Sequence, residues 1–335
     1  MFRLAILSYW HVHAKDYARD AGNHPDTVVT TVWDSDLERG KAAAAGIGAR
    51  FEPELEAVLA DPDIDGVIIT TPTTAHREVT IAAAKAGKHI FTEKVIAATL
   101  DDAKAILAAI DQAGVVFVVS LPRLANGYTQ VIKQMIDGGE LGEIGYFRMR
   151  VGHDGALATG KHPKGWLPEH FYRLDEAAGG ALIDLGAHPL YLTRYLVGMP
   201  ESVAAQFGYV TGREVEDHAV VSMRFASGAL AVAEVSFIDN PGTFEIEAHG
   251  SKGIIRYAAP KRKLVHRRGN MRGEAAIDPV VIDEPAELPS AFEQWVECIQ
   301  HGRPATENVA IALDLTRLAE AANRSAREGA FIAIS

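Results

Sequence analysis

The feature that most constrains the fold is an alternation of short apolar runs with amphipathic stretches over the first 120 residues. The apolar runs, which predict strands, cover residues 2–8, 27–33, 66–71, 88–92 and 115–120. The stretches with helical spacing cover residues 15–21, 37–45, 54–60, 75–86 and 100–113. Strands this apolar are covered on both faces. This part of an α/β protein is therefore expected to be a doubly wound parallel sheet of the Rossmann type, with its ligand at the carboxyl ends of the strands.

The pattern changes after residue 120, where strand-like runs follow one another without helices between them. After a helix over 128–137, these runs cover residues 146–151, 202–210, 218–225, 229–237, 243–248 and 253–257. Tandem strands predict an α+β domain with a largely antiparallel, open sheet. Two last helices, 290–300 and 309–327, are expected to pack back on the first domain. The sequence thus predicts a dinucleotide-binding domain over 1–120 and a substrate-binding and oligomerisation domain over 121–335.

The charge balance and the cysteine count limit the partners and the compartment. The 335 residues carry 33 Lys plus Arg against 44 Asp plus Glu, a formal net charge of −11, which argues against nucleic acid and anionic membrane as partners. The single cysteine, Cys298, excludes an intramolecular disulfide, as expected in a reducing compartment. Since the N-terminus has no signal-like apolar run, the protein is expected to be cytoplasmic. The open sheet face predicts a homo-oligomer.

The first predicted strand leads into a loop without the glycines of a dinucleotide-binding turn. Such turns read G-x-G-x-x-G, because glycine permits the tight turn and lets the backbone approach the pyrophosphate. Here Ser8, Trp10 and His13 take the glycine positions. If the loop still binds phosphate, we expect backbone amides, Ser8 and the protonatable His11 or His13 to make the contacts. The alternative is a packed aromatic turn that has lost dinucleotide binding.

Polar residues follow the next three predicted strands. Asp34 lies where an acidic side chain hydrogen-bonds the ribose diol of NAD, and no Arg follows immediately to offset its repulsion of the 2′-phosphate of NADP. The other candidates at this edge are Thr70, Thr71, Pro72 and His76 after the third strand, and Glu93 and Lys94 after the fourth. His76 opens a helix and is equally explained as a structural cap. A lysine directly after an apolar strand, beside a carboxylate that can orient it, indicates a functional role for Lys94.

In the second domain, Asp184 and His188 lie four residues apart, a spacing that places both on one face of a helix. A carboxylate beside an imidazole holds the ring and raises its basicity, as a general base near neutral pH requires. A helix-surface ion pair is the structural alternative. No further Asp, His or Cys cluster lies nearby in the sequence, so no metal site is expected.

An irregular polar segment before Asp184 mixes cations with aromatic residues. Its candidate substrate-binding residues are Lys161, His162, Lys164, Trp166, His170 and Tyr172. Such a composition suits a polyhydroxylated ring or an anionic group, and equally a solvated loop.

Together these segments resemble the glucose-fructose oxidoreductase/inositol dehydrogenase (Gfo/Idh/MocA) family along nearly the whole chain. The resemblance rests on Glu93-Lys94-Val95, where the family has Glu-Lys-Pro, and on Gly179-Gly180 followed by Asp184, Gly186 and His188. Glu216-Asp217-His218 and His249-Gly250-Ser251-Lys252-Gly253 match later strand patterns. The chain departs from the family in the missing glycines and in Val95, which replaces the usual proline.

The resemblance implies an NAD-dependent dehydrogenase that acts on a secondary alcohol of a sugar, inositol or related polyol. It assigns Lys94, Asp184 and His188 to catalysis, Asp34, Thr71, Pro72, His76 and Glu93 to the cofactor, and Arg123 to the neighbourhood of the substrate ring. A related possibility is an NAD-dependent glycoside hydrolase that oxidises, eliminates and re-reduces a sugar, for which Arg123, Lys161 and Lys164 would suit an anionic substrate. An alternative of another class is a ligand-sensing homologue without turnover.

Overall fold

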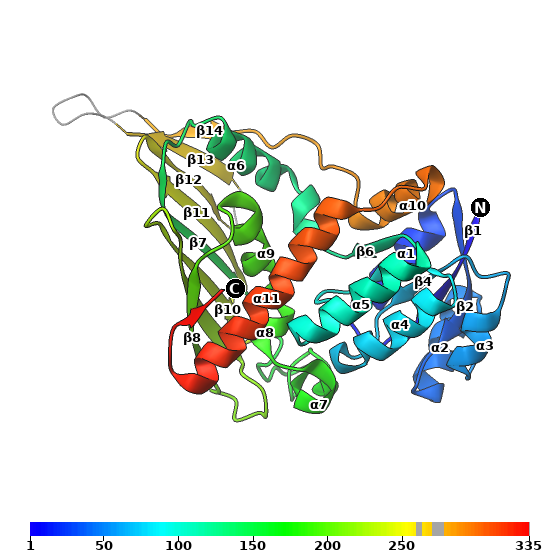
Figure 1. Ribbon diagram of the computed structural model, residues 1–335. Coiled ribbons are helices and arrows are strands. Elements are labelled where there is room, and N and C mark those ends of the chain that lie inside the picture. Colours follow the sequence, from blue (N-terminus) through cyan, green and yellow to red (C-terminus); the bar gives the residue numbers. More distant parts are fainter. Residues whose placement is uncertain (259–262, 270–277, 335) are drawn as a thin grey trace. The chain divides into compact units, whose positions relative to one another are not determined.

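The computed structural model describes residues 1–258, 263–269 and 278–334, and it divides into two compact units (Figure 1). The first unit comprises Met1–Leu121 and Pro289–Thr316, and the second comprises Pro122–Leu288 and Arg317–Ser335. The last helix, α11 (Thr306–Glu328), therefore begins in the first unit and ends in the second. None of the helices in the described ranges combines the length and the apolarity that crossing a membrane requires.

The first unit is built on a six-stranded parallel sheet, which confirms the predicted Rossmann-type fold. Its strands are β1 (Phe2–Leu7), β2 (Thr27–Trp33), β3 (Arg50–Phe51), β4 (Gly66–Ile69), β5 (His89–Thr92) and β6 (Phe117–Val119). Their order is β3-β2-β1-β4-β5-β6, so the winding direction reverses between β1 and β4. Sheets of this kind bind their ligands at the carboxyl ends of the strands beside such a reversal point.

Helices between the strands complete the first unit. They are α1 (Ala14–Asn23), α2 (Leu37–Ile47), α3 (Leu55–Ala60), α4 (His76–Lys85), α5 (Leu100–Ala113) and, from the end of the chain, α10 (Ala291–His301). α4 packs with α5, and α10 packs with α1, β5 and β6. Trp295 of α10 is fully buried, with its ring centroid 5.8 Å from that of Phe91. A capping box formed by Ser290 and Glu293 fixes the start of α10. The buried side chains of this helix include Phe292, Trp295 and Val296.

The second unit contains a nine-stranded sheet in the order β14-β13-β12-β11-β7-β10-β9-β8-β15. The strands are β7 (Ile144–Gly152), β8 (Ser202–Gly208), β9 (His218–Arg224), β10 (Leu230–Ser236), β11 (Thr243–Gly250), β12 (Gly253–Ala258), β13 (Lys263–Arg268), β14 (Val280–Ile282) and β15 (Ile332–Ala333). All neighbours pair antiparallel except β7 and β10, so the prediction of a largely antiparallel sheet is confirmed.

Short helices cover one face of this sheet (Figure 1). The helices of the second unit before β8 are α6 (Gly127–Asp137), α7 (Leu174–Ala177), α8 (Ala181–Asp184) and α9 (Ala187–Leu196). α9 packs on β7 and β10, and α8 packs on β9 and β10. Side chains of a strand alternate between the two faces, and in β7 Phe147, Met149 and Val151 are buried.

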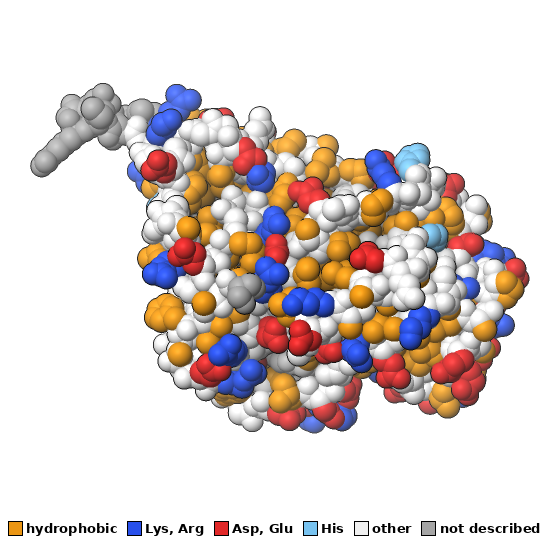
Figure 2. Space-filling model, viewed as in Figure 1, with side chains coloured by type: hydrophobic (Ala, Val, Ile, Leu, Met, Phe, Trp, Pro, Cys, Tyr) orange, Lys and Arg blue, Asp and Glu red, His pale blue; other side chains and the backbone are white. Residues whose placement is uncertain are grey.

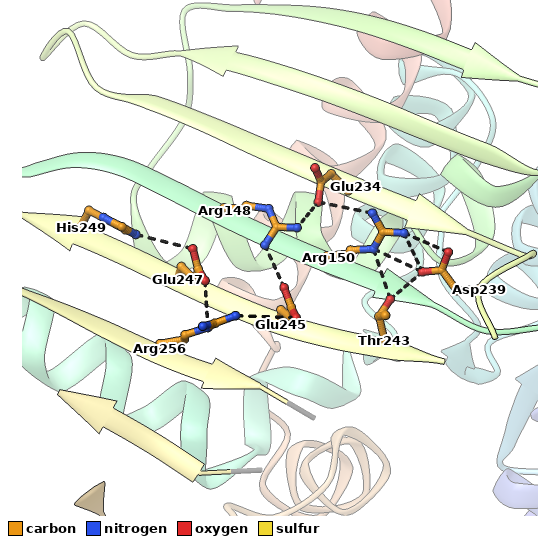
Figure 3. Close-up of polar contacts among 9 residues, drawn as sticks. All are labelled: Arg148, Arg150, Glu234, Asp239, Thr243, Glu245, Glu247, His249 and Arg256. Carbon is orange, nitrogen blue, oxygen red and sulfur yellow. Dashed lines mark hydrogen bonds and ion pairs between the residues drawn. The ribbon is translucent and has the colours of Figure 1, made fainter. Parts of the chain in front are cut away.

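The other face of the sheet carries a network of ion pairs across four strands (Figure 3). Arg148 of β7 lies 2.5 Å from Glu234 of β10 and 2.9 Å from Glu245 of β11. Arg150 of β7 lies 2.9 Å from Asp239. Arg148 is thus held between carboxylates of the two flanking strands, and such cross-strand pairs stabilise the register.

Basic and acidic side chains lie close together over the visible surface as well (Figure 2). Ion pairs also form along helices of the chain, such as Arg324 with Glu328 on α11, where the nearest nitrogen and oxygen are 2.7 Å apart. Exposed pairs of this kind contribute little stability each.

Candidate functional site

The loop after β1 keeps a tight turn although it has no glycine. Ser8 has a φ of 80°, the left-handed conformation that glycine usually supplies in such turns. Its backbone N–H donates to the carbonyl of Trp33 at 2.6 Å, and its Oγ accepts from the backbone N–H of Trp10 at 3.1 Å. The indole of Trp10 is buried, with 3% of the residue exposed. Local hydrogen bonds therefore hold the turn where glycine would otherwise be needed.

The loop after β4 is tied to this turn. The hydroxyl of Thr70 donates to the carbonyl of Ser8 at 2.5 Å, and the N–H of His11 donates to the carbonyl of Thr70 at 3.1 Å. Thr71 is also buried, and within the described part of the chain its hydroxyl has no hydrogen-bond partner. Pro72 then leads into the short 3₁₀ helix Thr73–Ala75. The structure thus brings these predicted cofactor-contacting residues together at the point where the sheet reverses.

Asp34 is held by an arginine that the sequence interpretation did not consider. The carboxylate is fully buried and accepts from Nε of Arg39 at 2.8 Å and from Nη2 at 2.6 Å. It also accepts from the backbone N–H of Tyr9 at 2.7 Å and of Asp36 at 2.9 Å. No arginine follows Asp34 immediately in the sequence, but α2 brings Arg39, five positions later, back over the strand end, where it offsets the carboxylate. Asp36, not Asp34, caps α2, as its side chain accepts from the N–H groups of Glu38 and Arg39.

Glu93 follows β5 and is the centre of a buried polar cluster. Its Oε2 lies 3.0 Å from Nδ1 of His13 and 3.6 Å from Nδ1 of His11, and it accepts a hydrogen bond from the hydroxyl of Tyr17. Because its one proton goes to Glu93, the Tyr17 hydroxyl accepts from the hydroxyl of Ser120, 2.8 Å away. Burial alone raises the pKa of the Glu93 carboxyl, but the nearby His11, His13 and Lys94 hold it well below its usual range. Sequence reasoning missed Tyr17, which lies one helical turn after His13.

Lys94 is a buried cation beside this carboxylate. Only 4% of the residue is exposed, its Nζ lies 3.8 Å from Oε1 of Glu93, and its backbone N–H donates to the same oxygen at 3.0 Å. The next peptide bond, Lys94–Val95, is cis. Nδ1 of His76, at the start of α4, donates to the carbonyl of Val95 at 2.8 Å, and burial lowers the pKa of this imidazole. His76 thus anchors the segment that follows Lys94.

In the second unit, Asp184 and His188 lie on two successive helices and not on the single helix that was expected. α8 ends at Asp184 and α9 begins at Ala187. Gly186 lies between them, where a Cβ would come within 2.3 Å of the Leu182 carbonyl, so a larger residue would push the helices apart. His188 is buried, with 6% exposed, and Asp184 is half-buried.

A tyrosine holds the imidazole of His188. Nδ1 of His188 lies 3.1 Å from the hydroxyl of Tyr191, which is itself fully buried. The same hydroxyl accepts from the backbone N–H of Arg123 at 3.0 Å. The sequence interpretation named only Asp184 as the orienting group. Tyr191 could have been found from its position, because a residue three places after His188 on a helix lies on the same face.

The glycine-rich turn before α8 is fixed by Glu216. This carboxylate accepts from the N–H of Leu182 at 2.9 Å and from that of Gly180 at 3.1 Å. Burial raises the pKa of Glu216, although these amide hydrogen bonds act in the opposite direction. The conformation of the segment that carries Asp184 therefore depends on a residue just before β9, more than thirty positions away, which no local pattern reveals.

The predicted substrate loop is divided between exposed cations and anchored aromatics. Lys161, His162 and Lys164 are exposed, and the structure does not gather them into a site. His170 is half-buried beside Phe171, with their ring centroids 5.3 Å apart.

Trp166 and Tyr172 hold the loop in place. Trp166 is 41% exposed, and its Nε1 donates to Asp154 at 2.9 Å. Tyr172 is buried, and its hydroxyl donates to the carbonyl of Gly155 at 3.1 Å. The guanidinium carbon of Arg213 lies 3.7 Å from the centre of the Tyr172 ring. Tyr172 therefore has a packing role, whereas Trp166 still offers a ring face.

His153, which the sequence interpretation missed, lies in the same region. Its ring stacks on Phe237, with an interplanar angle of 6°, and lies 4.7 Å from the ring of Trp166. Burial lowers the pKa of His153, while the carboxylate of Asp184 raises it, with a net lowering. The carboxylate of Asp184, which was predicted to act on His188, therefore also influences the pKa of His153.

Arg123 lies in the 3₁₀ helix Pro122–Ala125, and its side chain is engaged by aromatic residues. The guanidinium carbon is 4.3 Å from the centre of the Phe244 ring, and Nη1 donates to the hydroxyl of Tyr128 at 3.3 Å. Within the described ranges, its buried Nε has no hydrogen-bond partner. The predicted substrate contact is thus a cation held on an aromatic surface.

Comparison with known proteins agrees with this architecture. Residues 9–121 match the model of an oxidoreductase family with an NAD-binding Rossmann fold, and residues 129–256 match the C-terminal domain model of the GFO/IDH/MocA family. The chain is 30% identical to 1,5-anhydro-D-fructose reductase of Ensifer adhaerens, over 83% of this chain and 82% of the relative. It is 26% identical to the NAD-dependent scyllo-inositol 2-dehydrogenase of Bacillus subtilis, over 97% and 93% of the two chains.

A solved structure of levoglucosan dehydrogenase in complex with NADH and levoglucosan superposes with a TM-score of 0.82. It covers 99% of both chains at 21% identity, and at that identity the likeness establishes the fold. The matches to both domain models and to a relative over most of its length establish more. The chain belongs to the Gfo/Idh/MocA family of oxidoreductases and carries its NAD-binding Rossmann domain.

Proposed function

We propose that the protein is an NAD-dependent dehydrogenase that oxidises a secondary alcohol of a sugar, inositol or related polyol. The observation that carries the proposal is the buried ammonium of Lys94, beside Glu93 and directly after a strand of the NAD-binding sheet. A buried cation is costly unless it has a task or a partner, and here it lies where the family performs its chemistry. The relatives named above act on an anhydrosugar and an inositol, which supports this substrate class.

The residues at the reversal point of the sheet fit a dinucleotide. Ser8 retains the left-handed turn that the phosphate-binding loop requires, and the buried hydroxyl of Thr71 has a hydrogen bond to offer to a ligand. The histidines of the loop direct Nδ1 toward Glu93. Most backbone amides of the loop already donate within the chain. We therefore assign the pyrophosphate to the N-terminal end of α1, whose positive end attracts anions, and to the hydroxyl of Thr71. Asp34 hydrogen-bonds the ribose diol once Arg39 releases one of the carboxylate oxygens of Asp34.

Several residues of the chain have separate roles in the oxidation. His188 accepts the proton of the substrate hydroxyl, and Lys94 stabilises the negative charge that develops on the oxygen. The carbinol hydrogen leaves with its electron pair as hydride, which yields a ketone. The nicotinamide ring of bound NAD supplies the hydride acceptor. Asp184 and Tyr191 orient the imidazole, and Trp166 offers its exposed ring face to the sugar.

We also propose that the protein self-associates and works in the cytoplasm. The ion-pair face of the second unit's sheet exposes Val220 by 42% and Leu230 by 52%, beside charges that are already paired within the chain. An apolar surface with neutralised charges suits contact with a second copy. The single cysteine fits a reducing compartment. Light scattering coupled to size exclusion would give the mass in solution, and a mass of 36.1 kDa would contradict self-association.

The function is tested in two steps. Mass spectrometry of the purified protein first identifies bound NAD, and a panel of sugars and polyols is then assayed by the absorbance of reduced nicotinamide. Lys94→Ala should lower the rate of NADH formation by about 10²- to 10³-fold, whereas the matched control Lys104→Ala, at an exposed lysine of α5, should retain the wild-type rate. Release of a free sugar from a glycoside without net NADH would favour the redox-neutral hydrolase. Binding of a sugar without either product would favour the sensor.

A further inference from the structure

Two histidines from the loop after β1 and one carboxylate from the end of β5 form a compact ligand set. One ligand atom from each of His11, His13 and Glu93 lies within 4.8 Å of the others, in the part of the chain that the structure describes. We propose that these three side chains bind a single divalent transition-metal ion of the zinc type. Such a site goes beyond the dehydrogenase function. It also differs from our expectation from the sequence, which was that the chain has no metal site.

The composition and spacing of the set suit such an ion. Two imidazoles and one carboxylate are a recognised zinc ligand set, with a fourth position left for water. With ligand bonds of about 2.0–2.2 Å, tetrahedral geometry separates neighbouring ligand atoms by about 3.3–3.6 Å. Oε2 of Glu93 lies 3.6 Å from Nδ1 of His11 and 3.0 Å from Nδ1 of His13. Both separations are close to the tetrahedral values, and all three ligand atoms lie within 4.8 Å of one another.

The hydrogen bonds around the set prepare its atoms for coordination. Nδ1 of His11 accepts from the backbone N–H of His13 at 3.2 Å, so this nitrogen is unprotonated, as a metal ligand must be, and the ion would replace that long hydrogen bond. On Glu93, the ammonium of Lys94 faces Oε1, 3.8 Å away, whereas Oε2 faces the two histidines. The positive charge of Lys94 is thus directed at the oxygen that the proposed ion does not use.

Burial and access also fit a binding site. The side chains of His11 and Glu93 are only 6% and 2% exposed, so the surroundings strengthen their attraction for a cation. The side chain of His13 is 37% exposed and gives the ion a route from solvent. Tyr17 donates to Oε2 of Glu93 and holds the carboxylate in place, which is the usual task of a residue behind a metal ligand.

The test measures metal binding directly, with no nicotinamide or sugar present, so its outcome is separate from that of the dehydrogenase proposal. Untagged protein is stripped with a chelator, dialysed against Zn²⁺, and analysed for metal content by mass spectrometry. Co²⁺ titration then reports the coordination geometry through its visible absorption. The variants are His13→Asn, at a half-exposed position that should fold normally, and His301→Asn as a matched control at an exposed site on α10. Circular dichroism confirms that each variant is folded.

The proposal predicts one Zn²⁺ per chain in the wild type and in His301→Asn, with the intense visible bands of tetrahedral Co²⁺. His13→Asn should lose at least about 100-fold in affinity, since even a residue behind a ligand can cost 10- to 100-fold. Substoichiometric zinc in the wild type would overturn the proposal and leave the cluster as a hydrogen-bonded network. Unchanged binding in folded His13→Asn would overturn it as well, because the metal would then lie elsewhere.

Discussion

Replacing Tyr191 with Phe tests how the chain prepares His188 as a base. For Nε2 to accept the substrate proton, Nδ1 must carry a hydrogen and donate it to the Tyr191 hydroxyl, which lies 3.1 Å away. Tyr191→Phe removes that acceptor but leaves the imidazole in place. A hydrogen bond of this kind contributes about 0.5–1.5 kcal/mol, which corresponds to about a 2- to 13-fold loss of rate.

The same substitution has a separate cost in stability. The Tyr191 hydroxyl also accepts from the backbone N–H of Arg123 at 3.0 Å, and that donor would be left without its acceptor. A buried donor without a partner costs about 1–3 kcal/mol, which urea unfolding can measure. Tyr195→Phe, one turn further along α9, is the matched control and should change neither quantity substantially.

The assay is a pH-rate profile of alcohol oxidation with NAD saturating. Because the deprotonated imidazole accepts the proton, the rate should rise with pH through one ionisation in the wild type and in Tyr191→Phe. His188→Asn should lose about 10²- to 10⁴-fold and should also lose this dependence. If His188→Asn keeps substantial activity and the same pH dependence, His188 is not the base. If Tyr191→Phe is as inactive as His188→Asn, Tyr191 does more than orient the ring.

Three further predictions concern other residues. Lys94→Ala should lower turnover by about 10²- to 10³-fold while cofactor affinity stays within a few-fold, as titration and steady-state kinetics can check. The wild type should bind NAD at least about tenfold more tightly than NADP in a titration, because the carboxylate of Asp34 repels a 2′-phosphate. Arg39→Ala should increase this preference for NAD, since it removes the cation that offsets the carboxylate. Burial acts to raise the pKa of the Asp239 carboxyl, but hydrogen bonds from Thr243 and Arg150 hold it below its usual range. Its stabilising contribution is therefore present above about pH 4 and is lost as the pH falls further. Asp239→Asn should lower the free energy of unfolding at pH 7 by up to about 1 kcal/mol, and the difference should vanish in acid.

The sequence predicted the first sheet well, because its strands are apolar throughout and its helices repeat at helical spacing. Only β3 (Arg50–Phe51) was missed there, since two residues carry no periodic signal. In the second sheet, β13 (Lys263–Arg268) was not predicted, because its apolar residues, Leu264 and Val265, are adjacent and do not alternate with polar ones. β15 (Ile332–Ala333) was missed as well, since it is again only two residues long. Such strands form because their backbones pair with the free edge of a neighbouring strand, which the local sequence does not show.

The sequence named several residues that the structure brings together, but it could not show how they are paired. Asp34 was expected to face a ribose, yet its oxygens are satisfied by Arg39 and two amides, because the first turn of α2 folds back over the strand end. His11 and His13 were expected to face phosphate, whereas their Nδ1 atoms face Glu93, eighty positions away in the chain. Such pairings are decided by tertiary packing, which local spacing does not encode.

The most direct test of the dehydrogenase account follows the hydrogen itself. Polyols and sugars deuterated at their secondary carbinol carbons are incubated with the protein and NAD, and the reduced cofactor is analysed by mass spectrometry. The account predicts that deuterium passes from the carbinol carbon into the nicotinamide of NADH with at least one member of the panel, and that Lys94→Ala slows this transfer by about 10²- to 10³-fold. Binding of a polyol and NAD without any deuterated NADH, or deuterium transfer undiminished in Lys94→Ala, would contradict it.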